Sequence, residues 1–164
     1  MLIQKNVLVA ATAMTVWGKR GAVEKAIVVG NQRNWGVPST TNRIVAVPHF
    51  TDSINAALKA AESSTVFDLV IAEADIRFEN DGVALLNELF ERDRKTPQIL
   101  IGGVNERAFE HVEGWTLDQP SFIVVHQGRD MVERILQALT ETFAPTERPS
   151  CPISPERRYE SVAP

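Results

Sequence analysis

The sequence contains very little cysteine, no cluster of basic residues and no long apolar run. Its single cysteine, Cys151, cannot form a disulfide within the chain, so we expect a reducing compartment and a cytoplasmic protein. The net charge of −4, without clustered Lys and Arg, argues against a nucleic acid partner, because phosphate-binding surfaces concentrate basic side chains. The apolar stretch near the N-terminus is bounded by Lys5 and Lys19 and is too short to cross a bilayer, so we expect no membrane partner.

The remaining composition is that of an ordinary globular protein. With 44% apolar and 23% charged residues, the 164-residue chain is neither disordered nor fibrous, and its length suits one domain with a tail. Residues 145–164 contain five prolines and almost no periodic apolar positions. We therefore predict one domain over residues 1–144 and a flexible, Pro-rich tail over 145–164.

Strand-like and helix-like segments alternate five times along the domain. Short apolar runs predict strands over 6–11, 43–48, 67–74, 98–103 and 121–127. Helical spacing of apolar residues predicts helices over 15–31, 53–63, 82–93, 105–115 and 129–143. Such alternation, with apolar strands and short connections, predicts a five-stranded parallel α/β sheet with helices on both faces. In these sheets, binding sites lie beyond the carboxyl ends of the strands.

Several local features define the expected element ends. Pro48 is expected to close the second strand, and Thr51 or Asp52 to cap the helix that follows. "VVGNQRNWG" (28–36) predicts a helix stop and turn. Trp35 in this turn-rich segment is expected to cover an edge of the core, or alternatively to be an exposed contact residue.

The segment "DLVIAEADIRFENDGVALLNEL" (68–89), followed by "TPQILIGG" (96–103), resembles the receiver domain of bacterial two-component response regulators. The resemblance covers residues 6–143 and implies a flavodoxin-like, CheY-like fold with strand order 2-1-3-4-5. In receivers, a motif like Asp68-Leu69-Val70 leads to the aspartate that accepts a phosphoryl group from a histidine kinase, and here Glu73 holds that register. The Asp-Gly pair that opens the next helix comes one residue later than the common spacing.

The resemblance also implies which positions would form the pocket, and each of them differs from the receiver pattern. Ala10, Ala11 and Thr12 stand where an acidic pair would hold magnesium. Gly102 or Gly103 replaces the Ser or Thr after the fourth strand, and His126 or Gln127 replaces the Lys after the fifth. A hard divalent ion needs several oxygen ligands, so we expect a degenerate receiver, or pseudo-receiver, with no catalytic residue, metal or cofactor. Its vestigial pocket comprises Thr12, Glu73, Asp75, Gly102 and His126.

The acidic residues after the third strand admit more than one interpretation. Glu73 and Asp75 are expected to be solvated carboxylates at a strand end, although Glu73 could imitate a phosphorylated aspartate. Asp75 could instead be a shifted phosphoacceptor. His49, Asp75 and His126 follow three strands, but the second and fifth strands lie on opposite sides of the expected sheet, too far apart to share a metal ion.

These observations predict a non-enzymatic signalling or scaffold module that binds a protein partner, and they are also compatible with a homodimer. Functional receivers expose the surface around their fourth helix, fifth strand and fifth helix, here residues 105–143. The candidate contact residues are Arg107, Phe109, Trp115 and Arg129, because aromatic and Arg side chains dominate interface energies. The alternatives are an atypical phosphoacceptor response regulator that uses Asp75, or a small flavodoxin-like ligand-binding domain or enzyme.

Overall fold

The computed structural model describes residues 1–12, 19–37, 42–93, 95–102, 122–126 and 128–143. The predicted helix over 105–115, the tail over 145–164 and the contact residues Arg107, Phe109 and Trp115 lie outside these ranges. Among the described helices, none is long and apolar enough to cross a membrane.

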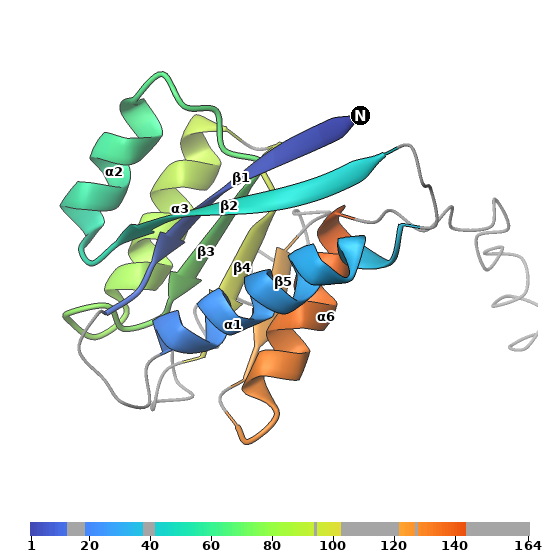
Figure 1. Cartoon of the computed structure of the whole chain (residues 1–164). Coiled ribbons are helices and arrows are strands. Elements are labelled where there is room, and N and C mark those ends of the chain that lie inside the picture. The colour runs from blue at the N-terminus through green and yellow to red at the C-terminus, as the bar shows by residue number, and fades with distance from the viewer. Residues whose placement is uncertain (13–18, 38–41, 94, 103–121, 127, 144–164) are drawn as a thin grey trace, which may run out of the picture.

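Five parallel strands form a single sheet in the order β2-β1-β3-β4-β5 (Figure 1). The strands are β1 (Leu2–Ala10), β2 (Arg43–Thr51), β3 (Leu69–Glu73), β4 (Gln98–Ile101) and β5 (Phe122–Val125). All residues of β3 and β4 and the second half of β1, residues 7–10, are buried, whereas the outer strands β2 and β5 are partly exposed; the buried inner strands suit a sheet covered on both faces. The predicted parallel sheet and its strand order are confirmed.

Helices cover both faces of the sheet (Figure 1). The helices α1 (Lys19–Gln32) and α6 (Met131–Phe143) pack on one face, whereas α2 (Ile54–Glu62) and α3 (Asp81–Arg92) pack on the other. Successive side chains of a strand point to opposite faces, so β1 contributes to both core layers. Val7 and Val9 belong to the layer under α1 and α6, and Leu8 and Ala10 to the layer under α2 and α3.

The second strand does not end at Pro48, contrary to the prediction. The strand β2 pairs with β1 along its whole length, from Leu2 opposite Arg43 to Ala10 opposite Thr51. It is one of the two outer strands of the described sheet, with only β1 beside it. Proline has no backbone N–H to donate. An edge strand tolerates it because an N–H on the open side of that strand would have no neighbouring strand to bind.

The cap of α2 is Ser53, so the prediction of Thr51 or Asp52 was wrong. The Ser53 hydroxyl accepts a hydrogen bond from the backbone N–H of Ala56 at 3.1 Å. Thr51 still belongs to β2, and its hydroxyl donates to the Val9 carbonyl at 3.1 Å. Asp52 forms an exposed ion pair with Arg77 at 3.4 Å.

The helix stop and turn predicted within 28–36 are confirmed, because α1 ends at Gln32 and a turn follows it. Trp35, within the short 3-10 turn η1 (Asn34–Gly36), is 1% exposed and its ring occupies the space that a side chain at position 30 would need. The ring also packs edge-to-face on Phe143 of α6, with ring centroids 5.2 Å apart. The expectation of a core-edge tryptophan is thus confirmed, and the alternative of an exposed contact residue is wrong.

Candidate functional site

The candidate site lies at the carboxyl ends of β1 and β3, which are adjacent in the sheet. Ala10 of β1 pairs with Ala72 of β3, so the residues after Ala10 lie beside Glu73, the last residue of β3. The helix α1 begins at Lys19, close to the same edge. Three segments that are distant in sequence therefore meet at Glu73.

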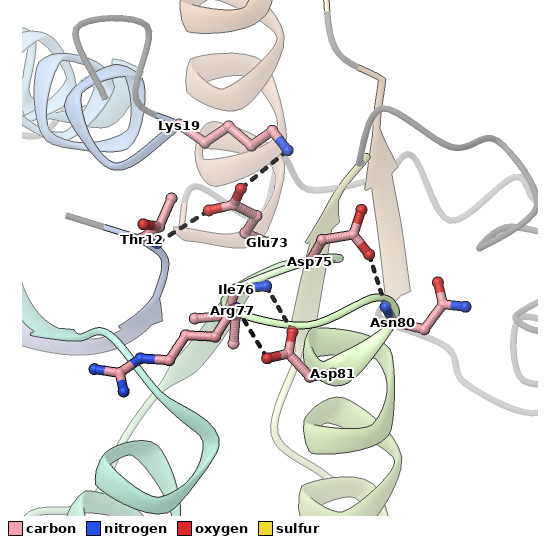
Figure 2. Close-up of polar contacts among 8 residues, drawn as sticks. All are labelled: Thr12, Lys19, Glu73, Asp75, Ile76, Arg77, Asn80 and Asp81. Atoms are coloured by element: carbon pink, nitrogen blue, oxygen red, sulfur yellow. Dashed lines mark hydrogen bonds and ion pairs between the residues drawn. The ribbon is translucent and has the colours of Figure 1, made fainter. Parts of the chain in front are cut away.

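The carboxylate of Glu73 is buried and has both oxygens engaged (Figure 2). Its Oε1 lies 3.1 Å from the Nζ of Lys19, and its Oε2 accepts a hydrogen bond from the backbone N–H of Thr12 at 3.0 Å. The side chains of Lys19 and Glu73 are only 9% and 7% exposed. The negative charge at the end of β3 is therefore balanced inside the protein by a buried ammonium group.

This arrangement corrects the sequence interpretation in two ways. Glu73 is not a solvated carboxylate, because its side chain is almost fully removed from water. Lys19 was missed as a site residue, since in the sequence it stands only as a charge beside an apolar stretch. Its partner lies 54 positions away, and no local pattern of charges links the two residues.

The loop from β3 to α3 is organised by two further carboxylates. Asp81, the first residue of α3, accepts hydrogen bonds from the backbone N–H groups of Ile76 at 2.6 Å and Arg77 at 2.9 Å (Figure 2). It also accepts one from the N–H of Phe78 at 3.1 Å. Asp75 is half-buried and accepts from the N–H of Asn80 at 2.7 Å. Both carboxylates thus hold the loop together by pairing with its backbone N–H groups.

Gly82 allows this loop to close tightly on the end of β3. Its N–H donates to the Ala74 carbonyl at 2.9 Å, and a Cβ atom at this position would collide with the backbone carbonyl of Glu73. The residue pair Asp81-Gly82 therefore has a structural basis here: the carboxylate fixes the loop, and the glycine permits the close approach.

The structure brings only part of the predicted pocket into direct contact. Thr12 touches Glu73 through its backbone N–H, whereas Asp75 bonds within its own loop. Gly102 is buried after β4 and donates its N–H to the Val125 carbonyl at 2.7 Å. His126 follows β5 and is exposed.

Within the described ranges, no group of three or more His, Cys, Asp or Glu residues is placed to hold a metal ion. His49 lies inside β2 rather than beyond its end. Its Nε2 is 3.2 Å from the Oδ1 of Asn6, and its ring packs edge-to-face on Phe67. The strand β2, which contains His49, and the strand β5, which precedes His126, lie at opposite edges of the sheet, as predicted.

No protein-family model and no curated protein matches the sequence of this chain. Its structure does match those of response regulators. The chemotaxis response regulator CheY4 of Vibrio cholerae is 11% identical with a TM-score of 0.56, over 86% of this chain and 100% of that one. The HemR receiver domain from Leptospira biflexa is 16% identical with a TM-score of 0.52, over 88% and 98% of the two chains.

A longer protein also matches. NtrX from Brucella abortus is 17% identical with a TM-score of 0.53, and the match covers 87% of this chain and 29% of that one. At such low identities these likenesses establish the fold and no more. The chain has a receiver-like fold, as the sequence predicted.

Proposed function

We propose that this chain is a non-enzymatic signalling or scaffold module, a receiver-like domain that does not accept a phosphoryl group and acts by binding another protein. The observation that carries the proposal is the buried ion pair between Glu73 and Lys19. Glu73 stands at the end of β3, in the register that the receiver resemblance gives to the phosphoacceptor aspartate.

Phosphoryl transfer to a carboxylate requires an oxygen that can reach the incoming phosphorus atom. Both oxygens of Glu73 already have partners, Lys19 and the N–H of Thr12. The residue is also only 5% exposed. An attack by Glu73 would have to break an ion pair that is largely removed from water, and an uncompensated buried charge is costly.

The surroundings of Glu73 also suit a magnesium ion poorly. Magnesium prefers near-octahedral coordination by oxygen, but β1 ends at the buried, apolar Ala10 and is followed by the buried, apolar Ala11. The ammonium group of Lys19 lies 3.1 Å from Glu73 and would repel a divalent cation at that carboxylate. Lys19 already balances the charge that a metal would balance in phosphoryl transfer, which supports a pocket fixed in one state.

A domain with a fixed pocket would signal through its surface. The proposed contact surface spans residues 105–143, where Arg129 is exposed just before α6. Arg107, Phe109 and Trp115 complete the proposed set by sequence. The partner is a protein, and a second copy of this chain is one form that the partner can take.

The phosphoryl part of the proposal is tested by incubating the full chain with acetyl phosphate and magnesium and measuring its intact mass. The expected result is a mass identical to that of a sample without the phosphodonor. A gain of one phosphoryl group would overturn the proposal. If that gain disappears in Asp75→Asn, the chain is an atypical phosphoacceptor that uses Asp75.

The binding part is tested by capturing partners with the wild-type chain and with a variant in which Arg107, Phe109, Trp115 and Arg129 are all replaced by Ala. The matched control is Lys59→Ala, an exposed charge on α2 and outside the proposed surface. The same partners should bind the wild type and the control but not the fourfold variant, provided that its circular dichroism is unchanged. Equal capture by all three proteins would reject this surface.

A flavin or nucleotide absorbance in the purified protein would instead support the ligand-binding alternative.

A further inference from the structure

The amino half of β1 projects beyond the strand β3 beside it (Figure 1). β1 pairs with β2 from Leu2 onward, but its pairing with β3 begins only at Val7. On the side of β3, the stretch 2–5 therefore has none of the described strands beside it. We propose that a segment of the C-terminal tail, residues 156–163, pairs with this open edge as an additional short strand. The proposal is independent of the function proposed for the Glu73 site.

The backbone groups on this edge belong to Leu2 and Gln4. The N–H of Asn6 donates to the Asp68 carboxylate and its carbonyl accepts from the Asp68 N–H, each at 2.8 Å, on the side away from β2. Alternate residues of a strand bond to the same side, so Gln4 and Leu2 also direct their N–H and carbonyl groups away from β2. Leu2 is 65% exposed and Gln4 is exposed, so this edge is open to solvent.

The outer edge of β2 shows how such groups are protected elsewhere in the same sheet. The side chain of Asn31 donates to the Ala46 carbonyl at 3.0 Å and accepts from the Ala46 N–H at 2.8 Å. The side chain of Asn34 accepts from the Ile44 N–H at 2.9 Å, and Pro48 has no N–H. An open edge is a template for another strand, and folded proteins normally block it in such ways. The hydrogen bonds of the described residues give the stretch 2–5 of β1 no such protection, which suits it to receive a strand.

The strength of the pairing decides which strand can occupy the edge. Leu2 and Gln4 offer two donors and two acceptors, and one backbone hydrogen bond contributes about a factor of five to an equilibrium constant. Four such bonds correspond to a dissociation constant of about 1 mM, before the cost of bringing two molecules together. A free partner would therefore bind poorly. A segment of the same chain has an effective concentration of millimolar order, which is enough to occupy the edge.

The tail leaves the domain near the projecting half of β1. The helix α6 ends at Phe143, whose ring packs edge-to-face on Trp35 with ring centroids 5.2 Å apart. The neighbouring Asn34 holds the N–H of Ile44 in β2, and Ile44 lies opposite Ile3 of β1. A short series of contacts thus connects the end of α6 with the open edge.

One stretch of the tail has the composition of a strand. Residues 156–163, "ERRYESVA", are the longest Pro-free run of the tail and lie between Pro155 and Pro164. The run contains Tyr159 and Val162, which are residue types that favour strands. The connection over 144–155 can span about 40 Å when extended, which exceeds the length of β1.

The test is hydrogen exchange of the backbone amides in the ¹⁵N-labelled full chain, measured by NMR. The Gln4 N–H should exchange about fivefold more slowly in the wild type than in the double variant Tyr159→Pro, Glu160→Pro. Adjacent residues of a strand direct their N–H groups to opposite sides, so this variant removes an inward-facing donor in either register. The amide of Lys5, which faces β2, should exchange at the same rate in both proteins.

The control is the double variant Glu147→Pro, Ile153→Pro. It also removes one negative charge and one apolar side chain and adds two prolines, but outside the run 156–163. The Gln4 amide of this control should exchange as slowly as that of the wild type.

Cys151, the only cysteine of the chain, allows a second measurement on the wild-type sequence. A nitroxide label attached to Cys151 should broaden the Gln4 amide signal, because the docked run would hold the label near this edge. The Thr12 amide, beyond the other end of β1, should keep its line width.

Three outcomes contradict the proposal. Equal exchange of the Gln4 amide in the wild type and the Tyr159→Pro, Glu160→Pro variant would show that the run does not protect it. Absence of broadening at Gln4 in the labelled wild type would show that the tail does not reach the edge, and this result does not depend on a variant that folds. Protection of Gln4 that increases with protein concentration would show that a second copy occupies the edge instead.

Discussion

Replacing Lys19 by methionine should lower the free energy of unfolding by about 3–5 kcal/mol, because it leaves the buried carboxylate of Glu73 without its cation. The two side chains are 9% and 7% exposed, so water cannot take over the lost interaction. Methionine keeps most of the apolar length of lysine, and the effect is therefore one of charge rather than of volume. A loss of this size is a large part of the stability of a domain, which is typically about 5–15 kcal/mol.

The ion pair of Arg134 with Asp130 provides the matched control. Its N–O distance is 2.9 Å, slightly shorter than that of the buried pair, but its side chains are 48% and 56% exposed. Because exposed pairs are worth about 0–1 kcal/mol, Arg134→Met should cost less than about 1 kcal/mol. The comparison separates the contribution of burial from that of distance.

Urea denaturation followed by circular dichroism measures both variants, and a double variant completes the cycle. Lys19→Met combined with Glu73→Gln should recover most of the stability lost in Lys19→Met, since no unpaired charge then remains and the amide oxygen can still accept from Thr12. The reasoning is refuted if Lys19→Met costs no more than Arg134→Met. It is also refuted if the double variant is as unstable as the sum of the two single variants.

Two further predictions follow from local contacts. Gly82→Ala should lower the free energy of unfolding by about 2–3 kcal/mol in urea denaturation, because the added Cβ would collide with the backbone at the end of β3. Gly21 in α1 faces open space, so the control Gly21→Ala should be neutral or stabilising by up to about 1 kcal/mol. Equal effects of the two substitutions would contradict the contact at Gly82. The pKa of Asp93 lies below its usual value because the carboxylate accepts hydrogen bonds from the N–H of Lys95 and from the Thr96 hydroxyl. The small contribution of the ionised Asp93 to stability is therefore fully present above the pKa that this carboxyl has in the unfolded chain. It is lost as the pH falls through the lower pKa that the carboxyl has in the folded protein. An NMR titration should show this pKa rising in Thr96→Val, and an unchanged value would contradict the role of the hydroxyl.

The fold was predictable because its determinants are local and periodic. Short apolar strands alternate with amphipathic helices such as α6, and this alternation alone indicates a covered parallel sheet. The strand order came from the receiver resemblance of the segment over 68–89. The length of β2 could not be read locally, because whether Pro48 ends a strand depends on whether that strand lies at the sheet edge.

The site was harder to predict because it depends on contacts between distant segments. The sequence placed Glu73 correctly at the end of a strand, yet its burial depends on Lys19, which reaches it from the start of another element.

The central claim is that the Glu73 carboxylate is held by Lys19 and Thr12 and accepts no phosphoryl group. The most direct measurement is an amide spectrum of the full chain with acetyl phosphate and magnesium, recorded alongside its intact mass. The account predicts an unchanged mass and an unmoved Thr12 amide signal, because the hydrogen bond of that amide to Glu73 persists. A phosphorylated species accompanied by a shifted Thr12 signal would contradict it.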